Sequence, residues 1–213
     1  MTDRPFYHQG SRQLQDEFDS RRIADRLEAV TLHHTLTEGD KAFVARSSMF
    51  FLATVDLDGY PECSYKGGTP GFVRTIGDNQ LAFPDYDGNG MFRSLGNMLL
   101  NSHVGLLFVD FEHPDRMRIN GSATVHMEDP LLDAYPGARM IVRVDELVIF
   151  PNCPRYVHTM KLEKLSIYAP RYDYQPPTPD WKRMDEFRDA LPEPGLAVRK
   201  DRQRGGGGEA THE

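Results

Sequence analysis

The sequence contains little of what marks a secreted, membrane-bound or nucleic-acid-binding protein. Only two cysteines, Cys63 and Cys153, occur among its 213 residues, so no disulfide framework is predicted. There is no hydrophobic signal segment, and no apolar run approaches the length of a transmembrane helix. The formal net charge of −7 argues against a general nucleic-acid binder, which usually has a basic face. We therefore expect a soluble, cytoplasmic protein with no membrane or nucleic-acid partner.

Recognisable metal and nucleophile motifs are also missing. No histidine or cysteine cluster has zinc spacing, and no Ser/His/Asp pattern is visible. The residues from Asp85 to Gly90 match the start of the EF-hand loop pattern. Counted from Asp85, however, the twelfth loop position is Gly96, where calcium needs a bidentate glutamate. The sequence therefore predicts no metal site, and its catalytic residues stay unknown.

What the chain does contain is a succession of short apolar and alternating segments. Leu14, Phe18, Ile23, Leu27 and Val30 recur at near-helical spacing and predict a helix over 11–33, with a short helix following at 38–46. In sum we expect six or seven short antiparallel strands with one helix, 91–101, inserted midway. The predicted strands form two hairpins, at 49–66 and 72–83, three long strands, at 104–111, 116–127 and 140–150, and a last short strand at 161–169.

Composition divides the chain into three parts. Residues 1–41 form a predicted helical extension, and residues 42–170 form one domain that is mainly β within the α+β class. Close-spaced antiparallel strands suggest a barrel or sandwich there rather than a βαβ fold. Residues 171–213 are rich in proline, charge and then glycine, so the end of this tail is expected to be disordered.

A glycine-rich loop before the inserted helix favours an anion site. Gly88 and Gly90 let the backbone approach a ligand, and the N-terminus of the helix offers unpaired N–H groups. Arg93 adds a fork of donors suited to phosphate, and Ser94 adds a neutral donor. Lys66, at the end of a predicted strand, would add a second positive charge. A solvated turn with an ordinary surface arginine is the alternative that the loop leaves open.

The order of these segments resembles a known family. An apolar strand and a "DLDG" turn lead to a strand ending in "CSYKGG", and a hairpin, "AFPDYDGNGMFRSLGNMLLNSHVGLLFVDF" and "RMRINGSATV" follow. Over residues 42–150 this succession is similar to the pyridoxamine 5′-phosphate oxidase-like flavoproteins. The resemblance implies an FMN-binding split β-barrel and a homodimer that holds FMN at the subunit interface. It also implies an oxidoreductase that acts on a small molecule.

The resemblance further implies which residues contact the cofactor. Lys66 falls on the family's strand lysine, and Arg93 falls on the arginine of its "S-R-K" motif, with Ser94 in place of the second basic residue. Arg116 falls near a position where a polar side chain often contacts the flavin ring. The full expected cofactor set is Ser64, Tyr65, Lys66, Gly67, Phe83, Pro84, Arg93, Ser94 and Arg116.

Two departures separate the chain from the oxidase members of that family. Pro61 stands where those members have an arginine, and their C-terminal arginine-histidine signature is absent after Arg171. The resemblance therefore implies FMN binding more strongly than it implies pyridoxal phosphate production. Two alternatives stay open: a reductase of the same fold that uses the deazaflavin F420, and a non-catalytic FMN-binding or sensing protein.

A second polar segment, "FPNCPRYVH", follows the long strand at 140–150. Asn152, Cys153, Arg155 and Tyr156 concentrate polar and reactive groups there, between prolines that fix the path of the chain. One hypothesis is that these residues line the substrate side of the flavin, from the partner subunit. The alternative is a rigid surface turn, and the residues by themselves slightly favour that alternative.

Overall fold

The chain divides into two compact units, Met1–Pro176 and Pro177–Glu213, in a computed structural model that describes residues 5–192. The second unit contains, within its described residues, the short helices η2 (Asp180–Arg183) and α5 (Asp185–Arg188), which the sequence reading missed. The glycine-rich end that was predicted to be disordered lies outside the described residues.

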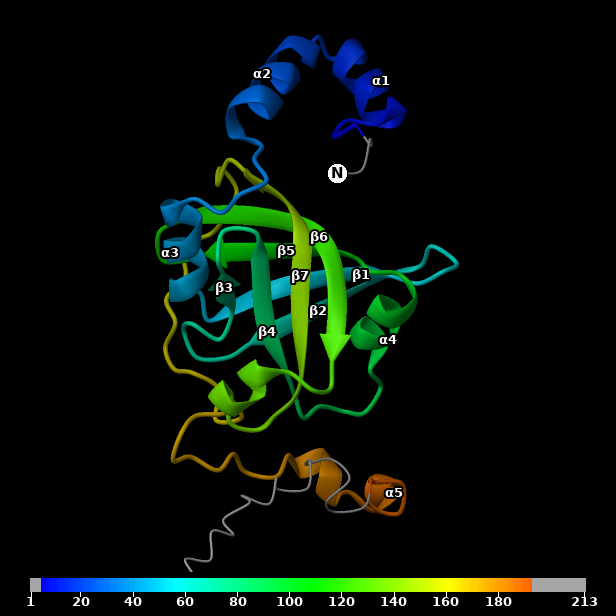
Figure 1. Ribbon diagram of the computed structural model, residues 1–213, viewed down its shortest axis with the longest axis vertical. Helices are drawn as coiled ribbons and strands as arrows, with labels where there is room; N and C mark the ends of the chain where they lie inside the picture. Colours follow the sequence, from blue (N-terminus) through cyan, green and yellow to red (C-terminus); the bar gives the residue numbers. More distant parts are fainter. Residues whose placement is uncertain (1–4, 193–213) are drawn as a thin grey trace, which may run out of the picture. The chain divides into compact units, whose positions relative to one another are not determined.

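The first unit is built around one seven-stranded antiparallel sheet (Figure 1). Its strands lie in the order β2-β1-β5-β6-β7-β4-β3, so β2 and β3 form two edges that are not joined to each other. The sheet is therefore an open, split barrel, which confirms the predicted fold class. Its strands are β1 (Met49–Val55), β2 (Pro61–Gly67), β3 (Arg74–Ile76), β4 (Gln80–Tyr86), β5 (His103–Asp110), β6 (Asp115–His126) and β7 (Ala138–Pro151).

The sheet curls around a single main core of buried apolar side chains. The ring of Phe50 on β1 lies 5.0 Å from the ring of Phe83 on β4 and 5.2 Å from that of Phe108 on β5. Because β1 and β4 are far apart in the sheet order, this contact means that they face each other across the core. Each large apolar side chain buried here contributes about 1.5–3 kcal/mol to folding.

A bulge in β6 helps the sheet to bend. The pairing of β6 with β7 shifts register between Asn120 and Ser122, at Gly121. A Cβ atom on Gly121 would lie 2.6 Å from the carbonyl oxygen of Asp145, which is too close for any other residue. Glycine therefore permits the close approach of two strands at this point.

Two helices pack against the sheet where the sequence predicted them. Helix α3 (Glu38–Arg46) begins with a capping box in which the side chains of Thr37 and Asp40 bond each other's backbone N–H groups. Helix α4 (Arg93–Leu100) buries Leu95 and Met98 and packs against β1, β2 and β6. It begins two residues after the predicted start. No described helix is long and apolar enough to cross a membrane.

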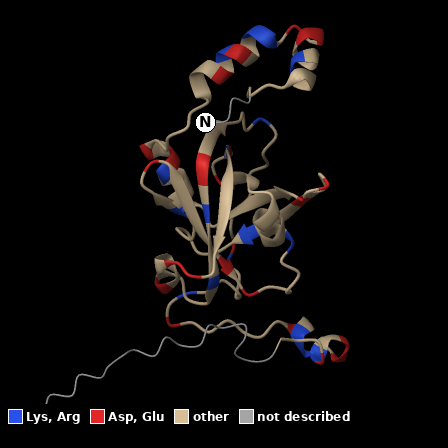
Figure 2. Cartoon of the chain, turned by 45° about the vertical axis from the view of Figure 1, so that its right-hand side comes forward, with Lys and Arg blue, Asp and Glu red and all other residues tan. Residues whose placement is uncertain are grey.

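The N-terminal helix predicted as one piece is two helices, α1 (Gln9–Glu17) and α2 (Arg21–Thr31). The chain turns between them at Asp19, whose φ of +47° is left-handed, a conformation that aspartate tolerates better than most residues. Both helices carry acidic and basic side chains, as Figure 2 shows, and Arg21 pairs with Asp16 across the turn. The apolar residues that predicted the helix are exposed, with Phe18 at 75% and Val30 at 73%.

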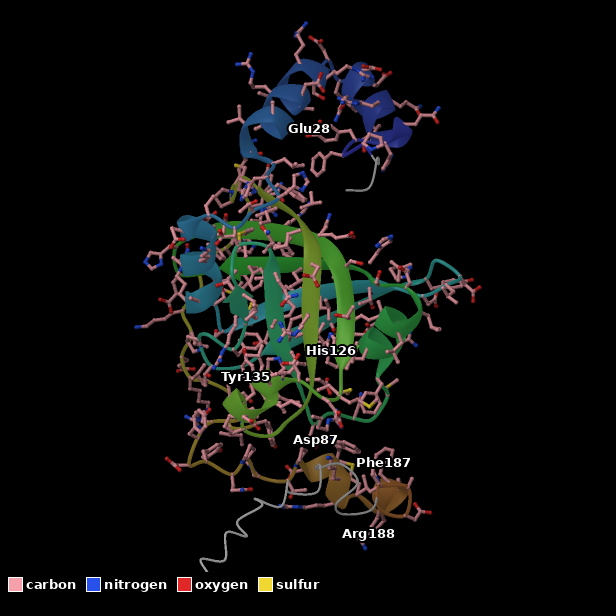
Figure 3. The ribbon with its side chains drawn as sticks, viewed as in Figure 1. Glu28, Asp87, His126, Tyr135, Phe187 and Arg188 are labelled. Atoms are coloured by element: carbon pink, nitrogen blue, oxygen red, sulfur yellow. The ribbon has the colours of Figure 1, made fainter. Side chains whose placement is uncertain are left out.

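A smaller apolar cluster lies beside the main core. Tyr135, just after the short helix η1 (Pro130–Ala134), packs with Ala82 and Ile141, and the guanidinium of Arg74 lies 4.8 Å from its ring centre (Figure 3). Burial raises the pKa of Tyr135 to about 12, so its phenol is neutral near pH 7. This cluster closes one end of the sheet below β4 and β7.

The prediction of a strand at 161–169 is wrong. The structure has no strand there, and the backbone N–H of Ala169 instead donates to Ser166 in a turn. Lys161, Glu163 and Lys164 are exposed, so no alternating buried face forms. The segment follows the sheet without joining either of its edges.

Candidate functional site

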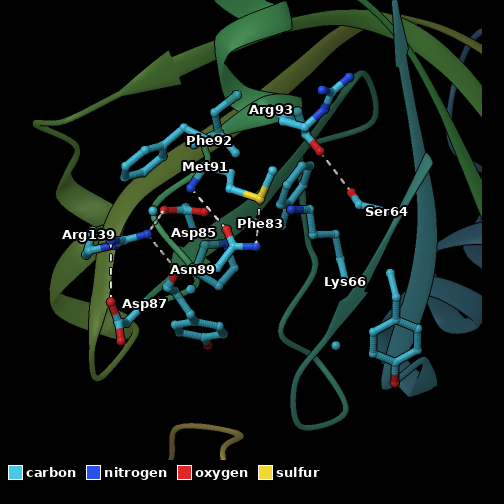
Figure 4. A pocket seen from close by; sticks show the side chains of 18 of the residues that line it. Ser64, Lys66, Phe83, Asp85, Asp87, Asn89, Met91, Phe92, Arg93 and Arg139 are labelled. Carbon is cyan, nitrogen blue, oxygen red and sulfur yellow. Dashed lines mark hydrogen bonds and ion pairs between the residues drawn. The ribbon is translucent and has the colours of Figure 1, made fainter. Parts of the chain in front are cut away.

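The glycine-rich loop between β4 and α4 helps to form a cavity of about 420 Å³ (Figure 4). This volume lies in the range of ligand pockets, roughly 300–1,000 Å³. Strand β2 supplies one part of the lining, and β4, the loop, the start of α4, Arg139 of β7 and Phe72, which lies between β2 and β3, supply the rest. All the cofactor-binding residues predicted from the sequence, except Arg116, line this cavity. The lining comprises Glu62, Ser64, Tyr65, Lys66, Gly67, Phe72, Phe83, Pro84, Asp85, Tyr86, Asp87, Gly88, Asn89, Gly90, Met91, Phe92, Arg93, Ser94, Leu95 and Arg139.

The loop turns sharply into α4 through two left-handed residues. Gly90 has φ +77°, and Phe92, at the N-cap, has φ +49° and ψ +27°. A left-handed conformation costs a residue other than glycine about 1–2 kcal/mol, so Phe92 is locally strained. The side chain of Asn89 accepts a hydrogen bond from the backbone N–H of Met91 at 3.0 Å, which stiffens the turn. No side chain caps α4, so its first N–H groups remain available.

Two further features of the cavity are the cations Lys66 and Arg93. Lys66 is half-buried at the end of β2, and Arg93 is exposed in the first turn of α4. Neither side chain forms a hydrogen bond or an ion pair with any residue between 5 and 192. Because the N-terminus of α4 carries a partial positive charge as well, this part of the cavity is suited to an anion.

A third cation, Arg139, is already neutralised. Its guanidinium lies 3.0 Å from Asp85 and 3.5 Å from Asp87, donates to the backbone oxygen of Tyr86, and lies 4.9 Å from the centre of the Phe92 ring. Burial raises the pKa of Asp85, while the charges of Arg139 and Lys66 oppose that rise. Arg139 therefore ties Asp85, near the end of β4, and Asp87, in the loop, to β7.

A carboxylate and two hydroxyls form the β2 side of the cavity. The hydroxyl of Ser94 donates to Oε2 of Glu62 at 2.6 Å. The hydroxyl of Ser64, from which a dashed line runs in Figure 4, lies 2.9 Å from that of Ser94. Oε2 of Glu62 also accepts from Thr54 at 3.3 Å. Ser94 is buried, so the structure assigns it to this network rather than to the outer, cationic part of the cavity.

The β4 side of the cavity is mainly aromatic. The ring of Phe83 packs into the core against Phe50, and Pro84 follows it on the strand. Burial, and to a smaller extent the neighbouring Tyr135, raises the pKa of Tyr86 to about 12. The phenol of Tyr86 therefore stays protonated near pH 7 and offers a neutral hydroxyl at the edge of the cavity.

Residues 36–153 match the family described as pyridoxamine 5′-phosphate oxidase. The match spans more than half of the chain and includes every strand that lines the cavity. The chain belongs to the pyridoxamine 5′-phosphate oxidase family. A comparison with curated protein sequences found no match.

Three solved structures illustrate what the chain is similar to. HupZ from Group A Streptococcus is 20% identical, with a TM-score of 0.45, over 59% of this chain and 99% of its own. A putative pyridoxamine 5′-phosphate oxidase from Lactobacillus delbrueckii is 22% identical, with a TM-score of 0.46, over 55% and 95%. An FMN-binding protein from Syntrophomonas wolfei is 12% identical, with a TM-score of 0.41, over 67% and 96%. At this level of similarity the three structures carry no argument about this chain.

Arg116 and residues 152–156, which follow β7, lie close to each other and do not line the cavity. The guanidinium of Arg116 donates to the carbonyl oxygen of Cys153 at 2.8 Å, and the N–H of Asn152 donates to the carbonyl oxygen of Arg116 at 3.3 Å. Within residues 5–192, Nε of Arg116 and Oδ1 of Asn152 are buried without a partner. Cys153, Arg155 and Tyr156 are exposed, Tyr156 at 83%. The predicted substrate-side residues are therefore not joined to the cavity within one chain.

Four charged residues that line the cavity were not among the predicted site residues: Glu62, Asp85, Asp87 and Arg139. Glu62 lies on β2 next to predicted residues, and its alternation with Ser64 and Lys66 on the strand would have placed it on the same face. Arg139 had a weaker signal. The acidic Asp85 and Asp87 needed a cation once calcium was rejected, but nothing in the sequence indicated an arginine so far along the chain.

Proposed function

We propose that this member of the family is an FMN-binding oxidoreductase that acts on a small molecule. The observation that supports it best is the cavity itself. It places Lys66, at the end of β2, and Arg93, in the first turn of α4, beside an aromatic wall, and neither forms a hydrogen bond or an ion pair within residues 5–192. A phosphate group and a flat ring are the two ligand parts that such a lining suits.

The donor set also agrees with FMN. The cavity is lined by three cations, Lys66, Arg93 and Arg139, and three carboxylates, Glu62, Asp85 and Asp87. Both aspartates pair with Arg139, so Lys66, Arg93 and the N-terminus of α4 are the groups that can give a phosphate monoester charge-assisted hydrogen bonds. The longer acidic tail of F420 would need more cations than this cavity supplies, so F420 is the less favoured cofactor. A Cβ at Gly88 or Gly90 would meet nothing within 4 Å, so the loop leaves open space there.

In this proposal each residue of the chain has a simple task. Lys66, Arg93 and the first N–H groups of α4 hold the phosphate, and the backbone of Gly67 and of the Phe83–Pro84 segment passes beside the ring. Arg139 fixes the loop in place through its contacts with Asp85 and Phe92. FMN, when bound, supplies the electron-transfer chemistry, so the protein need only bind, orient and shield it.

The proposed assembly is a homodimer with FMN at the subunit interface. Arg116 and residues 152–156 lie apart from the cavity of their own chain and include two buried, partnerless polar atoms. We place this segment of one protomer beside the cavity of its partner, on the substrate side of the flavin. Such an arrangement would give Nε of Arg116 and Oδ1 of Asn152 the hydrogen bonds they lack within residues 5–192.

Reduction and turnover test the enzymatic part of the proposal. Purified protein saturated with FMN is mixed with NADH or NADPH without oxygen, and the flavin absorbance is followed. We expect bleaching, and then its reversal when a small-molecule acceptor is added. Binding of FMN without reduction by either donor or turnover with any acceptor would instead support a non-catalytic flavin-binding protein.

Alkylation of Cys153 tests the proposed position of residues 152–156. The exposed Cys63 is first changed to serine, because it would react as well. We expect FMN to slow the labelling of Cys153 in the dimer, since the cofactor would lie beside it. Equal labelling rates with and without FMN would place this segment away from the site.

A further inference from the structure

The carboxylate of Glu62 sets the direction of every hydrogen bond on the β2 side of the cavity. Its Oε2 receives the hydroxyl of Ser94 at 2.6 Å and that of Thr54 at 3.3 Å. A carboxylate has no proton to give, so both hydroxyls must donate to it. Thr54 in turn accepts from the side-chain amide of Asn97 at 3.0 Å, which leaves the threonine proton free to point at Glu62.

The same reasoning shows which group receives the hydroxyl proton of Ser64. The hydroxyls of Ser64 and Ser94 lie 2.9 Å apart, and geometry alone allows either one to donate. Ser94 has a single proton and uses it on Glu62 in a short, charge-assisted bond. Ser64 must therefore donate to Ser94. Both serine protons are committed within the protein, and neither serine can donate to a ligand.

What this side of the cavity offers a ligand is therefore only acceptors. The remaining lone pairs of Ser64 Oγ are one, and Oε1 of Glu62 is the other, since it has no hydrogen bond within residues 5–192 and is not buried. A phosphate oxygen would meet two acceptors and a negative charge here, which is unfavourable. A hydroxyl group would find a charged acceptor that strengthens its hydrogen bond.

We propose that Glu62 and Ser64 form a subsite that accepts a hydroxyl of the ligand and excludes its phosphate. This inference rests on the proposed function and makes it more specific. The polyol chain that joins the ring of FMN to its phosphate carries the hydroxyls that fit. Glu62, held by Ser94 and Thr54, is thereby a specificity-determining residue that separates the polyol from the phosphate held by Lys66 and Arg93.

The test compares two ligands, FMN and riboflavin, which share the polyol chain and differ by the phosphate. Their dissociation constants are measured by fluorescence quenching for the wild type, for Glu62→Gln and for Glu17→Gln. Glu17 is exposed on α1 and loses the same charge, so it serves as the matched control. The melting temperature, Tm, is recorded for each variant without ligand.

Glu62→Gln should weaken riboflavin binding about fivefold, because a charged acceptor becomes a neutral amide. FMN binding should weaken less, because the negative charge that opposes the phosphate is removed as well. The ratio of the riboflavin Kd to the FMN Kd should therefore rise, and Glu17→Gln should leave it unchanged. Tighter FMN binding with unchanged riboflavin binding would place Glu62 at the phosphate and overturn the proposal. Equal weakening for both ligands would overturn it too.

A second variant keeps the test decisive if Glu62→Gln lowers Tm too far to be used. Ser64→Ala removes one acceptor and no charge, and it leaves the bond between Ser94 and Glu62 in place. It should weaken FMN and riboflavin equally, by about threefold. No effect on riboflavin would refute the subsite. A wild type that binds neither flavin would refute the proposed function itself, a result distinct from either variant failing.

Discussion

Removal of the charge of Lys66 or Arg93 should weaken FMN binding and spare riboflavin binding. Lys66→Met keeps most of the side-chain stem and deletes the charge, and Arg93→Ala deletes the guanidinium at the start of α4. A hydrogen bond between charged groups contributes about 1.5–3 kcal/mol, which is roughly a 10- to 150-fold change in Kd. Arg93 is exposed and screened by solvent, so we expect about tenfold for it and more for the half-buried Lys66.

The assay is a titration of each variant with FMN and with riboflavin at two salt concentrations. The effect of Arg93→Ala on FMN binding should shrink at higher salt, because counter-ions screen an exposed charge. Arg26→Ala, on the exposed side of α2, controls for the loss of a surface arginine. If either cavity variant weakens riboflavin as much as FMN, the residue does not hold the phosphate, and the reasoning about the anion site is wrong.

Three further changes test the surrounding structure. Arg139→Gln should weaken FMN binding several-fold in a titration and lower Tm, because Asp85 and Asp87 lose the charge that ties the loop to β7. Gly121→Ala should lower the free energy of unfolding in urea by about 1–3 kcal/mol, because its Cβ meets the backbone of β7. Asp129→Asn should cost about 3–5 kcal/mol at pH 7, because it breaks the partly buried pair with Arg143.

The pH dependence of the Asp129→Asn variant follows from the sign of the pKa shift. Hydrogen bonds from Arg143 lower the pKa of Asp129 in the folded state. The stabilisation is therefore complete above the unfolded value, near 4, and is lost as the pH falls through the folded value. Urea unfolding at pH 7 and near pH 3 should show a smaller difference between variant and wild type at the lower pH. A constant difference would contradict this assignment.

Local patterns were enough to predict most of the sheet. The strands β1, β5, β6 and β7 are long apolar or alternating segments bounded by turn residues, so their periodicity identified them. The break at Asp19 was missed because a single left-handed aspartate interrupts an otherwise continuous helical pattern. The strand expected at 161–169 failed because strand formation needs a pairing partner, which propensity alone does not reveal.

The cavity was predictable where its residues follow one another along the chain. Gly90, Arg93 and Lys66 were found from glycine spacing and from charges at the ends of elements. Arg139 was missed because its place beside Asp85 depends on the pairing of β4 with β7. The role of Ser94 changed because its hydroxyl is used by Glu62, a contact between α4 and β2 that no local pattern indicates.

The identity of the bound cofactor tests the central claim most directly. The protein is purified, heated to release any bound molecule, and the supernatant is analysed by mass spectrometry; protein without colour is first incubated with FMN. The account predicts a yellow protein that releases FMN. Release of F420, or a colourless protein that takes up no FMN, would contradict it.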